Sequence, residues 1–181
     1  RELLSWLKHH HPAIAHMDKA DWFALKQSVL QQQPELKSDV TVWRLVQLKQ
    51  AFSQVGYDDD AAHSAAQAAV EVALDWRNRF EVPQQSLDVL AQLGQEIPLV
   101  AITNGNVDLD RIGLTPYFQQ VFKAGPDGSA KPAPDMFTKA QQFLDLPSEH
   151  ILHVGDHLVT DVQGAKLSGF AACWFLSLIH I

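Results

Sequence analysis

The sequence predicts an α/β protein in two parts, a helical domain at residues 1–79 and a core with a parallel sheet at residues 80–181. Apolar residues recur at helical spacing up to about residue 78, and nothing in that stretch alternates as a strand would. From residue 82 onward, helical stretches alternate with short apolar runs, which is the pattern of βα units in a parallel sheet.

Four helices are expected in the N-terminal domain, each from its apolar spacing and a stop signal. The first three end at Pro12, before Pro34 and at Gly56. The fourth begins at the acidic run 58–60, whose charges complement the helix macrodipole, and continues through alanine-rich sequence to about Asn78. These signals predict a helical bundle.

The core is expected to alternate helices and strands. In chain order we expect a helix at 84–93 stopped by Gly94, a strand at 97–103, a helix at 135–144, a strand at 151–155, a helix at 159–168 closed by Gly169, and a strand at 170–175. Ligands of open parallel sheets bind beyond the carboxyl ends of the strands. Thr103, Asn104 and Asp156 stand at such ends.

Composition and charge narrow the function classes. The formal net charge is -7 and no Lys/Arg cluster occurs, which argues against a nucleic-acid partner. The one cysteine, Cys173, excludes an internal disulfide and is typical of a reducing compartment; within an apolar strand we expect it to be buried. No apolar run reaches the roughly 18 residues of a membrane span. We expect a cytoplasmic protein without a membrane partner.

The polar residues at the strand ends favour a phosphoryl site. Thr103, Asn104 and Gly105 offer a hydroxyl, an amide and a flexible backbone, which together can cradle a phosphoryl group. Lys131 precedes a proline, which biases its backbone toward an extended conformation. Asp156 is a hard oxygen ligand suited to Mg²⁺, an ion that takes one or two carboxylates with waters and substrate phosphate.

Asp161 is the second carboxylate of this constellation and lies near the start of the next predicted helix. Three roles stay open for it: orienting a metal-bound water, capping that helix, or holding Lys131. Alternatively, Asp156 and Asp161 could have purely structural roles, as an acid in a turn and a helix cap. Because they follow Thr103 and Lys131 in the sequence, the pattern favours a magnesium site instead.

Three segments, LVAITNGN, AKPAPDMF and ILHVGDHLVTDVQGAKLSG, resemble in order and spacing motifs two to four of the haloacid dehalogenase-like (HAD) phosphatases, over residues 80–175. The stretches DVTVWRL and DWRNRFEVPQQSLDVLAQL are similar to the YigB-type flavin mononucleotide phosphatases of that family. The resemblance implies a Rossmann-like core, with residues 1–78 as a helical cap inserted between its first and second strands.

The resemblance also implies roles for the site residues. Thr103 would bind phosphoryl oxygens, Lys131 would steady the charge on nucleophile and phosphate, and Asp156 would complete the magnesium site. The implied activity is hydrolysis of a small phosphomonoester through an aspartyl-phosphate, with flavin mononucleotide or a related riboflavin-pathway phosphate as substrate, by a monomer or weak homodimer. Trp43 and Arg44 are either ordinary helix residues or substrate contacts, since an aromatic face and a guanidinium suit a flavin ring.

The nucleophile motif of the family, Asp-x-Asp-x-Thr, does not occur in these 181 residues. We expect it to precede Arg1 and to lie on the central strand, so that neighbouring strands have unpaired edges. Without nucleophile and acid/base, we expect this chain to be inactive, because phosphate monoester hydrolysis needs accelerations of up to ~10²¹. The terminal FLSLIHI, residues 175–181, also departs from the family pattern.

Other interpretations stay open. The chain could be a non-catalytic binding protein or a degenerate paralogue, or the family chemistry could be that of a dehalogenase, which lacks the second Asp of the missing motif. His157 stands where relatives often carry an acid or small polar residue, and it would either perturb the magnesium site or face solvent.

Overall fold

The computed structural model describes residues 2–176 and divides the chain into two compact units. Unit 1 contains the residues up to Glu81 together with Asn106–Ile112, and unit 2 contains Val82–Gly105 and the residues from Gly113 onward. Of the FLSLIHI segment, residues 177–181 lie outside the described residues.

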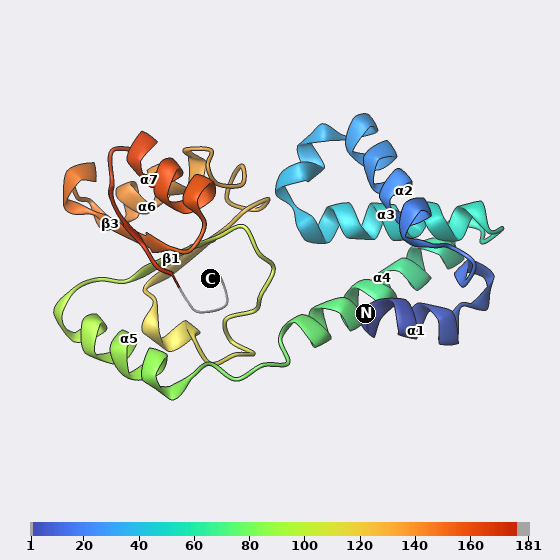
Figure 1. The fold of residues 1–181 in the computed structure, drawn as a ribbon, viewed down its shortest axis with the longest axis horizontal. Helices are drawn as coiled ribbons and strands as arrows, with labels where there is room; N and C mark the ends of the chain where they lie inside the picture. The colour runs from blue at the N-terminus through green and yellow to red at the C-terminus, as the bar shows by residue number, and fades with distance from the viewer. Residues whose placement is uncertain (1, 177–181) are drawn as a thin grey trace. The chain divides into compact units, whose positions relative to one another are not determined.

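Unit 1 is helical in all its regular structure among the described residues (Figure 1). Its elements are α1 (Glu2–His10), the 3-10 helix η1 (Pro12–Ile14), α2 (Lys19–Gln32), η2 (Pro34–Ser38), α3 (Val40–Gln54) and α4 (Asp59–Arg77). The four helices expected from the sequence are therefore confirmed, with ends close to the predicted stop signals.

Aspartates fix three of the helix starts. The Asp18 side chain accepts hydrogen bonds from Ala20 N and Asp21 N and forms a capping box at α2. Asp39 caps α3 by accepting from Thr41 N and Val42 N, and Asp58 caps α4 by accepting from Ala61 N. These bonds satisfy donors that a helix start leaves without partners.

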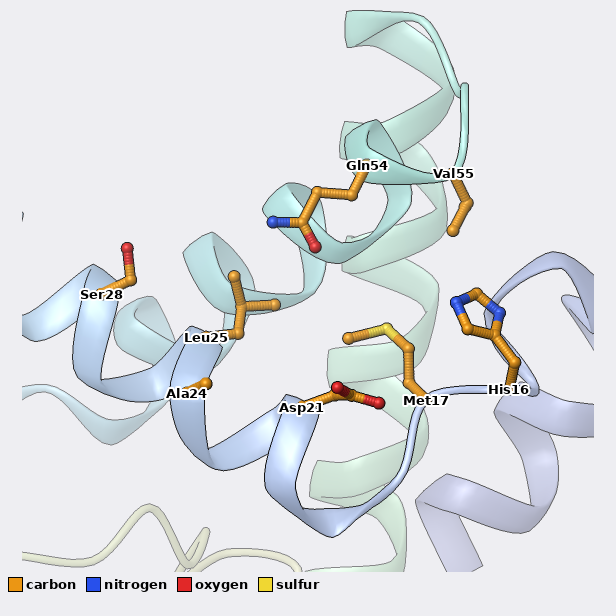
Figure 2. A pocket seen from close by; sticks show the side chains of 8 residues that line it. All are labelled: His16, Met17, Asp21, Ala24, Leu25, Ser28, Gln54 and Val55. Atoms are coloured by element: carbon orange, nitrogen blue, oxygen red, sulfur yellow. The ribbon is translucent and has the colours of Figure 1, made fainter.

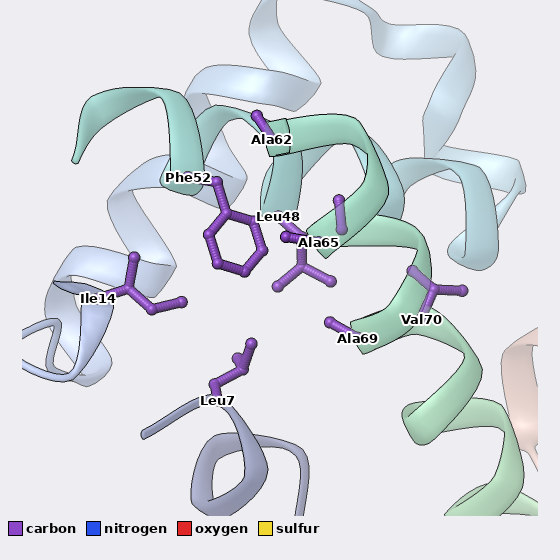
Figure 3. Close-up of a cluster of buried hydrophobic side chains, with 9 residues drawn as sticks. Leu7, Ile14, Leu48, Phe52, Ala62, Ala65, Ala69 and Val70 are labelled. Atoms are coloured by element: carbon purple, nitrogen blue, oxygen red, sulfur yellow. The ribbon is translucent and has the colours of Figure 1, made fainter. Parts of the chain in front are cut away.

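The core of unit 1 lies mainly between α3 and α4. Leu48 and Phe52 of α3 are 2% and 0% exposed. Figure 3 shows them against alanines of α4, among them Ala62, Ala65 and Ala69. Because alanine is small, α4 offers a shallow face on which the larger side chains of α3 pack closely.

Unit 2 alternates helices and short strands. Its elements are α5 (Gln84–Glu96), β1 (Val100–Thr103), η3 (Thr115–Tyr117), β2 (Gln120–Lys123), α6 (Asp135–Leu144), η4 (Ser148–His150), β3 (Leu152–Gly155), the π-helix η5 (Leu158–Gln163), α7 (Gly164–Leu167) and β4 (Ala171–Trp174). The expected α/β class with parallel strands is confirmed.

The strands form two parallel pairs, β1 with β2 and β3 with β4. The register runs from Val100 opposite Gln120 in the first pair and from Leu152 opposite Ala171 in the second. Ile102 of β1 packs against two buried clusters, one around Met136 and one around Phe137. Both clusters include residues of α6, so this helix supports both strand pairs.

Three details of the predicted core were wrong. The strand β2 was not predicted, and the helix that begins at Gln84 continues through Gly94 to Glu96. Gly94 does not have the left-handed backbone that ends helices, and an interior glycine costs a helix only about 1 kcal/mol. The predicted helix 159–168 is a π-helix followed by the short α7, although its stop at Gly169, with φ +82°, is confirmed.

Cys173 is exposed, which corrects the expectation of a buried thiol. It lies on β4, which pairs with β3 on one side, and both Ala171 and Cys173 are exposed on this strand. An apolar run alone therefore did not reveal which face of the strand is covered. No helix within residues 2–176 has the length and apolar character needed to cross a membrane.

The surroundings of His11 predict that the stability of unit 1 depends on pH. Its Nδ1 lies 3.2 Å from the Tyr57 hydroxyl, and its ring packs 4.7 Å from the ring of Phe52. Burial, and then the charge of His10, lower the pKa of His11 from its ordinary value of 6.5. As pH falls through that value the unfolded chain therefore binds the proton first, and the free energy of unfolding decreases.

We expect unit 1 to unfold at lower urea concentration at about pH 5.5 than at about pH 7.5. The His11→Gln variant should lose part of this difference, whereas His9→Gln, at an exposed position of α1, should keep it. Tryptophan fluorescence during urea unfolding would measure both. Equal pH dependence in the two variants would contradict a role for His11.

Candidate active site

Lys131 lies at the centre of the candidate site, in the loop between β2 and α6. Its side chain is 8% exposed. The Nζ atom donates to the carbonyl of Ile102 at 2.8 Å and to Oδ1 of Asp161 at 2.6 Å. An ammonium has three N–H groups, so two bonds fix its position and one N–H remains for a further acceptor.

Asn104 ties the predicted phosphate-binding loop to Lys131. Its Nδ2 donates to the Lys131 carbonyl at 2.9 Å, and its Oδ1 accepts from the Lys131 N–H at 2.7 Å. The Lys131–Pro132 peptide is cis. The Asn104 amide therefore positions the backbone of Lys131, and its predicted contact with substrate stays a prediction.

Thr103 and Gly105 complete this loop. The N–H of Gly105 donates to Oγ1 of Thr103 at 2.9 Å. Because the hydroxyl oxygen is the acceptor in this bond, its own hydrogen is available to a phosphoryl oxygen. Substrate binding by Gly105 stays a prediction.

Asp161 holds Lys131, which is one of the three roles that the sequence left open. Oδ1 accepts from Lys131 Nζ and lies 3.1 Å from His153 Nε2, and Oδ2 accepts from His157 N at 3.0 Å. Burial by itself would raise the pKa of Asp161, but the hydrogen bonds from Lys131, His153 and His157 lower it below its ordinary value. Asp161 is thus an ionised, 6% exposed carboxylate that anchors the lysine.

His153 is a part of this network that the sequence analysis missed. It lies on β3, and its ring packs against Phe137 at 5.2 Å. Burial lowers the pKa of His153, the hydrogen bond with Asp161 raises it, and the charge of Lys131 lowers it, with a net decrease. A polar residue inside the apolar run ILHVG was the signal that could have identified it.

Two glycines allow the elements around the ion pair to approach one another. A Cβ at Gly155 would lie 2.5 Å from the Asp161 Cβ and 2.8 Å from its Oδ2. A Cβ at Gly164 would lie 3.0 Å from Phe137 and 3.1 Å from Pro132. Both glycines of the motif are therefore explained by packing.

Asp156 and His157 follow β3 and are both exposed. The backbone carbonyl of Asp156 accepts a hydrogen bond from Trp174 Nε1 at 2.9 Å, which fixes this turn to the end of β4. The Nδ1 of His157 accepts from Thr160 N at 3.2 Å and caps η5. His157 is therefore a capping residue with an exposed side chain, as the solvent-facing alternative expects, and an effect on the magnesium site stays a prediction.

Of the two carboxylates predicted to bind Mg²⁺, Asp156 is placed to act as a ligand, whereas Asp161 is already hydrogen-bonded. Asp156 is an exposed carboxylate at a strand end, a position from which one protein ligand, waters and a phosphate could share the ion. The oxygens of Asp161 already accept hydrogen bonds from three groups, so its role as a metal ligand stays a prediction. Within the described part of the chain, no group of three or more His, Cys, Asp and Glu residues could hold a metal by itself.

Trp43 and Arg44, the other predicted substrate contacts, belong to α3 of unit 1. Lys26 Nζ lies 4.7 Å from the centre of the Trp43 ring, and the indole N–H of Trp43 is buried without a hydrogen-bond partner. One face of this ring is thus covered by a cation of the same unit. Arg44 is partly buried.

Unit 1 also contains a cavity of about 420 Å³ that none of the predicted site residues lines (Figure 2). Residues of α2, the end of α3 and the preceding loop surround it, among them Asp21, Leu25 and Gln54. Asp21 contributes to the capping box of α2, so its carboxylate is already engaged. The cavity is therefore a feature of the helical unit, and neither Lys131 nor Asp161 lines it.

A family model matches the stretch of chain that carries the buried lysine–aspartate pair, the Thr-Asn-Gly loop and the acid after β3. The model for haloacid dehalogenase-like hydrolases covers residues 4–169. This chain belongs to the haloacid dehalogenase-like hydrolases, and the enzyme class expected from the sequence is confirmed.

A curated protein and a solved structure of the same family are similar to this chain over most of its length. The chain is 44% identical over 174 residues to the 5-amino-6-(5-phospho-D-ribitylamino)uracil phosphatase YigB of Escherichia coli, covering 96% of this chain and 73% of that protein. The solved structure of a 2-haloacid dehalogenase from Pseudomonas syringae matches with a TM-score of 0.93 and 30% identity, covering 96% of this chain and 76% of that chain.

A more distant structure shows the fold alone. The putative HAD-hydrolase YfnB of Bacillus subtilis, solved with bound magnesium, has a TM-score of 0.62 and 22% identity, covering 96% of this chain and 79% of its own.

The clearance around Asp161 leads to a first test of the site. We expect Gly155→Ala to lower the free energy of unfolding by about 1–3 kcal/mol, because the new methyl group overlaps the Asp161 side chain. Gly94→Ala is the matched control: its Cβ would lie 3.8 Å from Leu99, inside a helix, so stability should stay equal or rise. Urea unfolding would measure both, and equal stability of the two variants would contradict the close packing.

The buried ion pair leads to a second test. Asp161→Asn leaves the buried ammonium without a counter-charge and should cost about 3–5 kcal/mol of stability. The double variant Lys131→Met/Asp161→Leu removes both charges and should be more stable than Asp161→Asn. Lys139→Met breaks the exposed Lys139–Asp127 pair and should cost less than about 1 kcal/mol. A small effect of Asp161→Asn in chemical unfolding would show that the pair is not an anchor.

Proposed function

We propose that the protein is a magnesium-dependent phosphomonoester hydrolase. The observation that carries the proposal is the position of Lys131, whose ammonium is fixed by Asp161 and the Ile102 carbonyl while Asn104 joins its backbone to the Thr103 loop. A fixed cation beside a hydroxyl donor is suited to the charge that develops on a transferring phosphoryl group. The name of the 44% identical relative, a phosphatase, supports the same class.

Each site residue has a defined task in this proposal. The Thr103 hydroxyl donates to a phosphoryl oxygen, and the remaining N–H of Lys131 binds phosphate or the nucleophile. Asp161 acts through Lys131 and holds its ammonium in place. Mg²⁺, held through Asp156, would neutralise charge on the phosphate.

The nucleophile is assigned to a segment outside these residues, since no Asp-x-Asp-x-Thr motif occurs among the 181. A carboxylate of that motif would attack phosphorus and expel the alcohol, and water would then hydrolyse the aspartyl-phosphate. The chain as it stands is proposed to bind without turnover. Unit 1 is proposed as the cap domain, where Trp43 and Arg44 would contact the part of the substrate remote from the phosphate.

The proposed substrate is a riboflavin-pathway phosphate. The relative YigB is named for a phosphate of a ribitylamino-uracil, and the sequence resemblance points to flavin mononucleotide phosphatases. Both compounds combine a phosphorylated ribityl chain with a planar, carbonyl-rich ring. The proposed location is the cytoplasm.

We expect hydrolysis of p-nitrophenyl phosphate and flavin mononucleotide only by a form extended upstream through an Asp-x-Asp-x-Thr strand, and only with Mg²⁺. In that form, Asp156→Asn and Lys131→Met should each lower kcat/KM by at least about 100-fold, since both remove charge stabilisation of the phosphoryl group. Asp145→Asn is the matched control: this exposed carboxylate has a left-handed backbone that asparagine tolerates, and activity should be unchanged.

A folded extended form that binds Mg²⁺ and releases no phosphate would contradict the proposal. Turnover by the 181-residue chain itself would contradict the assignment of the nucleophile to a segment outside it.

Dehalogenation is the second candidate function, because the structure that matches at a TM-score of 0.93 is a 2-haloacid dehalogenase. Chloride release from 2-chloropropionate by the extended form, without phosphate release from either ester, would favour it. The position two residues after the nucleophile would distinguish the two reactions, since the resemblance gives phosphatases a second Asp there.

A further inference from the structure

Arg44 of unit 1 stands where an apolar side chain would be expected. It lies on α3 four residues before Leu48 and eight before Phe52, so the three side chains share one face of the helix. Figure 3 shows Leu48 and Phe52 of this face against α4. Arg44 continues this packed face by one turn and is itself partly buried.

The guanidinium of Arg44 has no counter-charge within the described part of the chain. Among residues 2–176, no carboxylate lies within ion-pair distance of Arg44 or of Arg77, which belongs to the last turn of α4. The nearby acid Asp75 pairs with Arg79 and with Arg111, the second at 3.6 Å. Burial and the charge of Arg77 lower the pKa of Arg44.

Hydrogen-bonding groups lie on the same side of α3. Thr41 is three residues before Arg44, and its Oγ1 accepts from Asn106 Nδ2 at 3.1 Å. This bond leaves the Thr41 hydroxyl hydrogen and the second N–H of the Asn106 amide as donors. The Asp108 N–H donates to Asn78 Oδ1 at 2.8 Å, which fastens the same segment beside Arg77.

A partly buried cation without an acid partner is unfavourable, because its charge loses hydration and gains no compensating attraction. An arginine can reduce this cost by laying its alkyl stem along apolar neighbours. Packing of the stem, however, brings no anion to the guanidinium of Arg44, and the exposed Arg77 and two hydrogen-bond donors lie at the same end of the helix pair. These groups share one preference, which is for an oxygen anion.

We propose that Arg44 and Arg77, with the Thr41 hydroxyl and the Asn106 amide, bind an oxyanion, a phosphate or a carboxylate group. All four residues belong to unit 1, so the site does not depend on phosphatase activity. Assigning the ligand to a part of the substrate remote from the phosphate at the Thr103 loop rests on the proposed function. The planar guanidinium can present two parallel N–H groups to such a ligand, a geometry that lysine does not offer.

The test is a titration of the ¹⁵N-labelled 181-residue chain with inorganic phosphate, followed by the arginine Nε–Hε resonances. Sodium chloride at matched ionic strength corrects for screening, and acetate is titrated separately. We expect phosphate to shift the Arg44 and Arg77 resonances and Arg44→Gln to weaken binding by at least about 10-fold. Arg44→Lys, which keeps the charge without the fork, should restore part of the affinity.

The matched control is Arg79→Gln, which removes a neighbouring arginine that already pairs with Asp75, and its affinity for phosphate should stay within about 2-fold of the unchanged chain. Arg77→Gln, at an exposed position, gives a second measurement if Arg44→Gln does not fold. An acetate shift equal to that of phosphate would show that the site accepts either oxyanion, an acetate shift alone would assign it to carboxylates, and a phosphate shift alone would assign it to phosphoryl groups.

Two results would overturn the inference. One is a shift that sodium chloride reproduces. The other is an affinity for phosphate that stays unchanged in both Arg44→Gln and Arg77→Gln. If Lys131→Met then lost phosphate binding, the anion would be located at the Thr103 loop and the proposed function would remain intact. If phosphate shifts Arg44 equally in Lys131→Met, the oxyanion site stands even where the phosphatase proposal fails.

Discussion

The contact between the Lys131 ammonium and the Asp161 carboxylate is the constraint around which unit 2 is arranged. A charge pair of this kind is stable out of water only when its remaining hydrogen-bonding groups are also satisfied. The Ile102 carbonyl, the His153 ring and the His157 N–H supply those bonds. The pair therefore joins the end of β1, the strand β3 and the start of η5. A shift of any of these elements would break a hydrogen bond to a buried charge.

Much of the fold could be predicted because local signals and packing agree. The helix α6 was predicted to the residue, and the aspartates that precede α2, α3 and α4 are cap residues by type as well as by geometry. The strand β2 was missed for the opposite reason. It is a short QVFK segment with one buried residue, Phe122, so neither length nor alternation marks it, and its pairing with β1 comes only from the tertiary fold.

The candidate site shows a similar limit. The residue types of Thr103, Lys131 and Asp161 predict phosphate chemistry, but spacing alone left three roles open for Asp161. The choice among them depends on which donors reach its oxygens, and those donors come from segments up to 30 residues away in the chain. His153 was missed because a histidine within an apolar run marks a polar position but does not reveal its partner, the Asp161 carboxylate eight residues later.

The membership of Asn106–Ile112 in the helical unit has a consequence for taking the protein apart. The polypeptide passes from one unit to the other after Glu81, after Gly105 and after Ile112, so no single cut separates them. A fragment that ends at Glu81 lacks Asn106 and Asp108, which donate hydrogen bonds to Thr41 and Asn78. A fragment that starts at Val82 contains these two donors but lacks both acceptors. During synthesis α1 to α4 are made before β1, yet residues 106–112 of the same unit are made only after β1, so the helical unit is completed by sequence that interrupts its neighbour.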